Sequence, residues 1–473
     1  MPRTLLVLAL LALAGLPFLG RDPHPLRGDP PPDGSVAVTV YNGDLGLVRE
    51  QRRIPLETGT VRVPFRGVPS RIDPTSVGFR ALAHPGAVDV LEQNYEFDLL
   101  TPETLLQKYV GEEVMLYVRQ EDHEVPVRAR LLSTQGGAVY QIGDSIALNP
   151  PGRVVLPALK GDLKALPTLV WTLGSRVAGE EPVEVSYLTG GLSWKADYVA
   201  TIAEDGRTLD LGGWVTLDNT SGATYEDAKL KLVAGDLNRA PREEDQRRDA
   251  KMMELAAAAP DAAAFEERTF FEYHLYDLPR PTTIRNNQTK QIRLLEGGGV
   301  RTEKTYTLAG AAWYYTQAYG GEKGLKVGVY QELDNRRDNG LGIALPAGTV
   351  RLYQADRDGS LQLVGEDRID HTPRDERLRL KVGEAFDLVA ERRQTGFDVL
   401  DSAHLYEAAF EVTIRNHKDQ DVVVQVVEPL PSDWRMLSNT HPSEKLDAFT
   451  VGFPVPVKRN GETTLRYRMQ VKF

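Results

Sequence analysis

The sequence predicts an all-β protein built of tandem antiparallel β-sandwich modules of the immunoglobulin-like kind. Apolar and polar side chains alternate, as in 465–473, where every odd position is apolar and every even one polar. This period of two places one face of a strand on a core and the other in water. Dipeptides that tolerate positive φ separate the runs and predict hairpin turns. They are Asn42-Gly43, Asp205-Gly206, Asp358-Gly359 and Asn460-Gly461.

Two segments break this period. In 101–110, Thr101 is a helix cap, Pro102 suits the first helical position, and apolar residues follow at helical spacing before Gly111. This pattern predicts one short helix. The segment 241–268 is rich in Ala, Glu and Arg and has no β-branched residue, which predicts a helical or mobile insertion on the surface.

The chain is long enough for two or three domains, since 473 residues exceed one ordinary core. Residues 21–34 are dense in Pro, Gly and charge, and they predict a Pro-rich tether that cannot bury enough apolar surface to fold. We expect three β domains after the tether. They are an N-terminal domain (35–170), a central domain with the insertion (171–395) and a C-terminal sandwich module (396–473).

The first 20 residues predict a cleavable signal peptide. Arg3 precedes an unbroken apolar run, Leu5 to Leu13, and Ala12-Leu13-Ala14 has the small residues that a signal peptidase recognises. The run is too short to span a bilayer, and no later segment is long and apolar enough to do so. We therefore expect an exported protein of the periplasm, cell envelope or extracellular space, with no transmembrane segment after cleavage.

A weak internal repeat supports tandem modules. In 214–219 a strand pattern ends in Asn219 before a polar turn and the strand 229–233. In 411–416 the same pattern ends in Asn416 before a turn and the strand 422–427. An Asn side chain can cap a turn, so two modules of similar design would produce both segments, as would chance.

Charge and composition limit the function classes. A net charge of -11 opposes binding to nucleic acid, whose affinity comes mainly from Lys and Arg. The absence of Cys excludes thiolate zinc sites and cysteine nucleophiles. The sequence has no glycine-rich nucleotide-binding loop. It also has neither a His-x-His pair nor the His-Glu-x-x-His motif of zinc enzymes, so we expect no cofactor and no metal. The pair Glu272 and His274 would share one face of a strand, but such a polar pair is typical of an exposed strand.

One pattern resembles a hydrolase site. Gly143-Asp144-Ser145-Ile146 with Asp401 and His404 resembles the nucleophile and Asp-x-x-His blocks of GDS-type lipases and esterases, in which Ser attacks and His takes its proton. Those enzymes place the Ser at a strand-to-helix turn. Here 146–151 holds two prolines and cannot begin a helix. We expect 138–142 and 146–148 to form a hairpin instead, with Gly143-Asp144 in its turn.

An aromatic group offers the main binding candidate. Trp313, Tyr314, Tyr315 and Tyr319 lie among Ala and Gly and would suit stacking against sugar rings or a partner's side chains. The alternative is that alternate aromatic residues of a strand enter a sandwich core. In a strand, the neighbours Tyr314 and Tyr315 must point in opposite directions, so only one of them would be buried.

Several segments resemble the bacterial family called domain of unknown function 4139, also described as mucoidy-inhibitor-A-like. They are 187–198 (YLTGGLSWKADY), 213–222, 228–236, 90–98 and 434–473. The resemblance covers essentially everything after the tether. It implies an exported, β-rich envelope protein with no established activity, cofactor or catalytic residues. This chain lacks the coiled-coil segment of longer relatives.

These observations favour a non-enzymatic interaction or structural protein of the cell envelope. Its partner would be an envelope protein or a glycan, because tandem sandwiches are common binding scaffolds and leave sheet edges with which an extended segment can pair. The alternative is a secreted serine esterase that uses Ser145, Asp401 and His404.

Overall fold

The computed structural model describes residues 34–120, 123–158, 164–235, 237, 265–270, 273–401 and 405–472. The expected signal peptide, the tether up to residue 33 and residues 241–264 of the expected insertion lie outside this part. The end of that insertion differs from the prediction. Strand β16 (Glu266–Phe270) begins within it and pairs with β17 (Tyr273–Asp277), so its backbone groups bond in a sheet.

The described residues confirm an all-β fold with one α-helix. Helix α1 (Pro102–Lys108) begins where the sequence predicts, and the Thr101 hydroxyl accepts a hydrogen bond from the Thr104 N–H. Asn42-Gly43, Asp205-Gly206 and Asp358-Gly359 each join two antiparallel neighbours, as expected. The hairpin predicted at Asn460-Gly461 is wrong, because the strands on either side of it pair with other strands and not with each other. Short 3₁₀ turns complete the helical structure of this part of the chain. They are η1 (Pro74–Ser76), η3 (Ala312–Tyr315) and η4 (Arg337–Asn339).

The chain divides into two compact units that alternate along the sequence. The described part of the first unit is made of Arg52–Val68 and Ala83–Pro182, and the second unit of Ser35–Gln51, Pro69–Leu82 and Val183–Phe473. The expected division into three consecutive domains stays a prediction.

The first unit contains two sheets. One has the order β3–β11–β5, and its middle strand carries Leu169, Trp171 and Leu173, which are fully buried. The other has the order β10–β6–β7–β8–β9 and packs its own small core around Leu116, Leu131 and Tyr140. The strand bounds are β3 (Gly59–Arg66), β11 (Thr168–Ser175), β5 (Val88–Glu96), β10 (Arg153–Val155), β6 (Glu113–Gln120), β7 (His123–Ser133), β8 (Val139–Ile142) and β9 (Ser145–Leu148).

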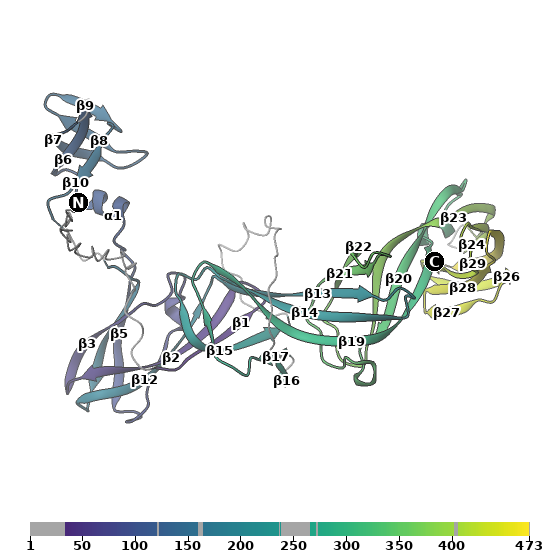
Figure 1. Cartoon of the computed structure of the whole chain (residues 1–473), viewed down its shortest axis with the longest axis horizontal. Helices are drawn as coiled ribbons and strands as arrows, with labels where there is room; N and C mark the ends of the chain where they lie inside the picture. Colours follow the sequence, from purple (N-terminus) through teal and green to yellow (C-terminus); the bar gives the residue numbers. More distant parts are fainter. Residues whose placement is uncertain are drawn as a thin grey trace, which may run out of the picture. The chain divides into compact units, whose positions relative to one another are not determined.

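The second unit contains most of two large sheets (Figure 1). The first has the order β16–β17–β15–β1–β2–β12–β4, with β18 beside β15, and adds the strands β15 (Tyr225–Ala234), β1 (Val36–Tyr41), β2 (Leu45–Leu56), β12 (Gly179–Thr189), β4 (Gly78–Ala81) and β18 (Thr282–Ile284). The second has the order β22–β21–β13–β14–β19–β20–β23–β24–β29–β26, and β25, β27 and β28 join it at β19. Its strands are β22 (Leu361–Ile369), β21 (Gly348–Ala355), β13 (Leu192–Ile202), β14 (Thr208–Asn219), β19 (Gln288–Ala309), β20 (Glu322–Asp334), β23 (Arg377–Asp401), β24 (Leu405–Asn416), β29 (Gly461–Lys472), β26 (Asp433–Asn439), β25 (Val422–Pro429), β27 (Glu444–Asp447) and β28 (Thr450–Val457).

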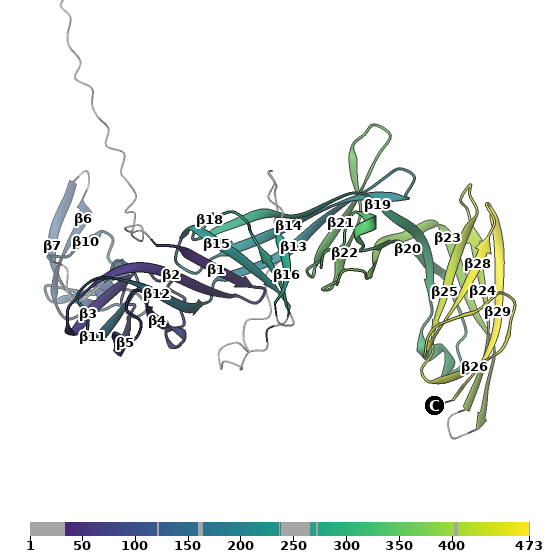
Figure 2. The same cartoon turned by 90° about the horizontal axis from the view of Figure 1, so that it is seen from below.

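The C-terminal part of this second sheet folds into a sandwich, which we call the C-terminal sandwich. Figure 2 shows β24 beside β29 and β25 beside β28, and both pairs are antiparallel. The alternation expected in 465–473 is present, since Leu465, Tyr467, Met469 and Val471 are buried while the residues between them are more accessible. They pack against the inward side chains of β24, β25 and β28 in one core.

Among the strand pairs described with their register, three are parallel, which the sequence did not predict. They are β1 with β15, β13 with β21 and β19 with β25. In each case the later strand follows a buried Asn, namely Asn219, Asn335 or Asn416. The chain turns at that Asn, leaves its antiparallel neighbour and pairs with a strand formed much earlier in the sequence.

The Asn side chains hold these turns in the same way. The Asn219 amide donates to the Ala223 carbonyl at 2.9 Å, and its oxygen accepts the Ser221 N–H. Asn416 repeats both bonds with Gln420 and Lys418. The repeat noticed in the sequence therefore corresponds to one shared turn, and Asn335 adds a related one, with bonds to Ile343, Pro373 and Gly342.

Candidate functional site

The aromatic group of the sequence prediction lies on a turn, not on a strand. Trp313, Tyr314 and Tyr315 belong to η3, which follows the end of β19. Tyr314 and Tyr315 are both buried, so the expectation that only one of them would be buried is wrong. A 3₁₀ turn rotates by about 120° per residue, and consecutive side chains can both face the core.

Three of these rings form a compact group that we call the aromatic cluster. The Tyr314 and Tyr319 rings are stacked, with centroids 4.7 Å apart. The Trp313 indole meets both of them edge-on, at 4.5 Å from Tyr314 and 5.2 Å from Tyr319. Trp313 is 46% exposed, whereas Tyr314 is 6% exposed. The cluster therefore presents one indole to solvent, supported by the buried Tyr314 and the partly buried Tyr319.

Gln394 of β23 fixes the backbone of this turn. Its side-chain oxygen accepts the Tyr319 N–H at 2.7 Å, and its amide donates to the Tyr314 carbonyl at 3.1 Å. The Gln394 side chain thus hydrogen-bonds to the backbone at both ends of the segment that carries the rings, at Tyr314 and at Tyr319. The position of the Trp313 indole is set by the sandwich and not by a free loop.

A buried ion pair lies beneath the cluster. The Arg392 Nη1 atom is 2.6 Å from the Glu428 Oε1 atom, and both side chains are fully buried. The Arg392 guanidinium also lies over the Tyr314 ring, 4.8 Å from its centroid. Tyr315 donates its hydroxyl to Glu428 at 2.9 Å, and the Tyr467 hydroxyl accepts from Arg392 at 3.0 Å. We call these four residues, Arg392, Glu428, Tyr315 and Tyr467, the buried polar group.

Burial and charge shift the titration of this group. Burial raises the pKa of the Tyr315 hydroxyl well above its usual range, and the Glu428 carboxylate raises it further. Burial is the largest single effect on Arg392 and lowers its pKa, but the Glu428 carboxylate and the neighbouring Tyr467 and Tyr315 together outweigh it, so the pKa of Arg392 is raised overall. Burial and the Glu428 carboxylate also raise the pKa of the Tyr467 hydroxyl. Both tyrosines thus stay neutral and Arg392 stays charged at physiological pH. Gly310 leaves room for the carboxylate, since a Cβ there would lie 2.0 Å from Glu428 Oε2.

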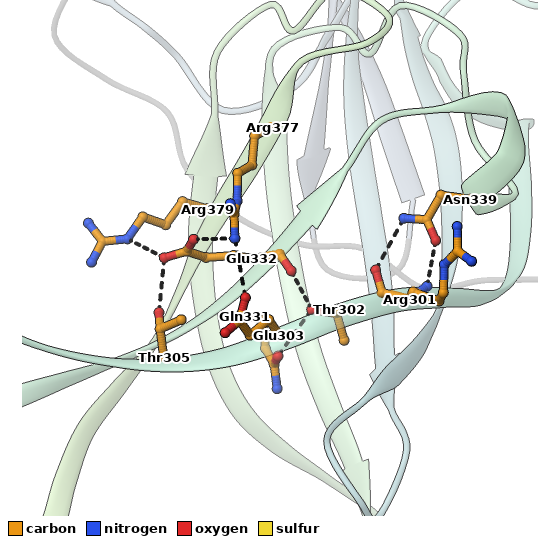
Figure 3. Close-up of polar contacts among 9 residues, drawn as sticks. All are labelled: Arg301, Thr302, Glu303, Thr305, Gln331, Glu332, Asn339, Arg377 and Arg379. Atoms are coloured by element: carbon orange, nitrogen blue, oxygen red, sulfur yellow. Dashed lines mark hydrogen bonds and ion pairs between the residues drawn. The ribbon is translucent and has the colours of Figure 1, made fainter. Parts of the chain in front are cut away.

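A second polar region covers β19, β20 and the start of β23 (Figure 3). Glu332 is its centre, because it accepts hydrogen bonds from Thr305 and Arg379 and pairs with Arg377 at 2.9 Å. Arg379 lies over the Tyr330 ring, 3.7 Å from its centroid. Glu332, Arg377 and Arg379 are thus paired across strands, which is typical of charge pairs that stabilise an exposed sheet face.

A groove of about 510 Å³ lies beside this region, lined by 205–207, 302–306, 420–423 and Gln425. The Lys304 pKa is lowered by burial and by the nearby Lys418, and Lys304 forms no ion pair among the described residues. The lining combines hydroxyl, amide and charged groups of both signs. This chemistry suits a polar, hydroxylated ligand better than an apolar one.

The esterase residues are only partly described. Ser145 is the first residue of β9, pairs with Ile142 of β8 and is exposed, which confirms the expected hairpin. His404 and the side chain of Asp401 lie outside the described residues. The proposed contact of Ser145 with His404 therefore stays a prediction.

The candidate metal pair, Glu272 and His274, is also only partly described. Glu272 lies outside the described residues, and His274 is in β17. Within the part of the chain that the structure describes, no three His, Asp or Glu side chains gather as metal ligands would.

The chain has no recognised relative that would assign a function to these residues. No protein-family model and no curated protein sequence matches it. The resemblance to the family of unknown function 4139 stays a prediction. Among the described residues, no helix has the length and apolar character needed to cross a membrane.

Sequence reasoning missed the buried polar group, although a signal for it exists. Val422, Val424 and Val426 point into the core, and Glu428 continues the same alternation. Arg392 likewise continues the inward positions Leu388 and Ala390. A charge at an inward position of a strand indicates a buried pair, because an unpaired charge there would be too costly.

Proposed function

We propose that this chain is a non-enzymatic interaction protein of the cell envelope, exported and built of β-sandwich modules. The observation that supports this proposal is the aromatic cluster, in which an exposed Trp313 is braced by two tyrosines. Its partner is an envelope protein or a glycan.

The cluster has the features of a binding anchor. Tryptophan and tyrosine supply a large contact area at a low cost in conformational entropy, and they dominate the energy of many interfaces. Trp313 loses little freedom on binding, because Tyr314 and Tyr319 already restrict its ring and Gln394 restricts its backbone. A flat indole held in this way can stack on a sugar ring or insert into a partner's pocket.

Export and location belong to the same proposal. The apolar run Leu5 to Leu13, the small residues after it and the resemblance to an envelope family support it. The net charge of -11 favours a neutral or basic partner over an anionic polymer.

Trp313 is expected to be the main quenchable tryptophan of this chain. Trp171 and Trp194 are at most 3% exposed, and Trp214 and Trp434 are only partly exposed. Replacing Trp313 with Phe should therefore remove most of the fluorescence that acrylamide quenches. Equal quenching of the variant and the wild type would contradict the exposed indole.

The binding test uses immobilised envelope glycans and immobilised envelope proteins as separate arms. The wild-type chain should be retained in one arm, and Trp313→Ala should weaken that retention about tenfold, as loss of an anchor does. Phe386→Ala is the matched control, since Phe386 is 91% exposed but outside the cluster. No retention in either arm, or equal loss in both variants, would overturn the proposal.

The esterase hypothesis remains the alternative and has its own test. Hydrolysis of a short acyl ester that disappears in Ser145→Ala would support it, because the serine oxygen is the proposed nucleophile. Asp144→Ala is the control, since it changes the same turn and leaves the hydroxyl in place. Unchanged hydrolysis in Ser145→Ala would exclude Ser145 as the nucleophile.

A further inference from the structure

The larger sheet of the second unit has a gap on one side of β19. Among the described residues, β19 pairs with β14 up to Arg301 and with β25 from Tyr306 onward. Between these two partners, 302–305 pair only with β20, on the opposite side of β19. The groove of about 510 Å³ opens in this gap, because its lining comes from the turn before β14, from 302–306 and from the chain at the start of β25. Such a volume is typical of a small-ligand site, which measures about 300–1,000 Å³.

Lys304 faces this groove with its backbone as well as its side chain. The Thr302 N–H donates to the Arg207 carbonyl at 2.9 Å, at one end of the groove. Because the N–H and C=O groups of alternate strand residues point to the same side, those of Lys304 point into the gap. Its side chain lies on the same face of β19 as Tyr306, an inward residue of the C-terminal sandwich. Lys304 thus offers a donor, an acceptor and a positive charge to one ligand.

The positive charge of Lys304 has no anionic partner among the described residues. The Lys304 Nζ atom is 5.9 Å from the centroid of the Tyr306 ring, and the Lys418 Nζ atom is 5.8 Å from the same point. Lys418 has a partner in Asp387, at 3.6 Å. Burial and the nearby Lys418 lower the pKa of Lys304, so its charged form is disfavoured where it lies. An anion bound in the groove would remove this penalty.

Three carboxylates line the groove, and each has a partner other than this lysine. Glu303 pairs with Arg377 at 3.5 Å, and Asp421 pairs with Lys458 at 2.7 Å. Asp205 accepts a backbone N–H within its own turn. All three belong to the lining of the groove, where their oxygens can accept further hydrogen bonds. The groove therefore combines one uncompensated positive charge with several acceptors that suit hydroxyl donors.

From this groove we infer a binding site for a small sugar acid, that is, a hydroxylated molecule with a single carboxylate. Its carboxylate pairs with Lys304, and its hydroxyls bond to polar side chains of the lining such as Asp205, Gln420 and Gln425. The net charge of -11 opposes a long anionic polymer, and the three carboxylates of the lining oppose a doubly charged phosphate monoester. This inference is independent of the aromatic cluster, because none of its three rings lines the groove.

The test compares the binding of D-glucuronate, D-glucose and D-glucose 6-phosphate to the full chain by saturation-transfer NMR titration. Glucuronate and glucose differ only at one carbon, which carries a carboxylate or a hydroxymethyl group, so the ratio of their Kd values measures the ionic contact. The wild-type chain should bind glucuronate about tenfold more tightly than glucose, as expected when a hydrogen bond becomes charge-assisted. Equal affinity for these two sugars, or tightest binding of the phosphate, would overturn the inference.

Two lysine variants separate the groove from the net charge of the chain. Lys304→Gln should weaken glucuronate binding about tenfold, to the level of glucose, because the ionic contact is lost. Lys326→Gln is the matched control, since it removes the same charge from an exposed lysine of the neighbouring strand β20 that does not line the groove. It should leave glucuronate binding unchanged. Equal losses in both variants, or a preference that survives in Lys304→Gln, would reject the site.

A cross-test keeps this inference apart from the proposed function. Trp313→Ala should bind glucuronate as the wild type does, and Lys304→Gln should be retained on immobilised envelope glycans or proteins as the wild type is. A loss of glucuronate binding in Trp313→Ala would show that the sugar acid binds at the aromatic cluster and not in the groove. That result would overturn the inference and leave the proposed function standing.

Discussion

Replacing Glu428 with alanine is expected to lower the free energy of unfolding of the C-terminal sandwich by about 3–5 kcal/mol. The change leaves the Arg392 guanidinium fully buried and charged without its carboxylate partner. Its Nε and Nη2 groups already lack hydrogen-bond partners among the described residues, so no neighbour is placed to replace Glu428. Faster hydrogen exchange in β25 and β29, together with a lower melting temperature, would measure this loss.

The matched control removes both charges. In Arg392→Met with Glu428→Leu, no uncompensated charge remains, and the aromatic rings around the pair can pack on the new side chains. Replacing a whole buried pair with apolar residues is often neutral or stabilising. We expect this double variant to recover most of the stability lost in Glu428→Ala. A double variant as unstable as the single one would show that the ion pair itself stabilises the sandwich.

Replacing Asn416 with alanine is expected to cost about 3 kcal/mol, the upper part of the range for unsatisfied buried groups. The Asn416 amide donates to the carbonyls of Gln420, Val457 and Lys458, and its oxygen accepts the Lys418 N–H. Alanine leaves these backbone groups without their partner in a buried turn. Thermal unfolding followed by calorimetry measures the effect.

Two other asparagine variants test whether the turn is the cause. Asn416→Asp keeps an acceptor but loses both donors, so it should be at least as damaging as alanine. Asn439→Ala removes an exposed side chain that bonds only to its local loop, at His441 and Ser443, and should cost less than about 0.5 kcal/mol. Similar losses in Asn416→Ala and Asn439→Ala would contradict the structural role of the buried turn.

The local features of this fold could be predicted from the sequence because they depend on neighbouring residues. Alternation identified β29, and the Thr101-Pro102 start identified α1. The repeated Asn219 and Asn416 were visible for the same reason, since each bonds to residues two and four positions ahead. In contrast, the parallel pairs join strands far apart in the chain, and no local pattern encodes such a partner.

The candidate site was predictable only in part. The sequence identified the aromatic residues Trp313, Tyr314, Tyr315 and Tyr319 as a candidate site. It also predicted that they lie on a strand, whereas the first three belong to a 3₁₀ turn. Treating the segment as a strand predicted that Tyr314 and Tyr315 would point to opposite faces of a sheet, whereas both side chains are buried in the same core. Arg392 and Glu428 stand at inward positions that the sequence displays, yet their pairing requires β23 and β25 to meet in three dimensions. The same long-range packing determines that Trp313 is the exposed ring.

The lengths of β19 and β23 have a mechanical consequence. These strands contain 22 and 25 residues, so each extends over roughly 70–80 Å at the usual rise of a strand. β19 pairs first with β14 and later with β20 and β25, without an intervening linker. A pulling force along this strand would load many ladder bonds in shear at once. Within the second unit, tension would therefore be carried by the hydrogen-bonded sheet itself, and yielding would require neighbouring strands to slide past each other.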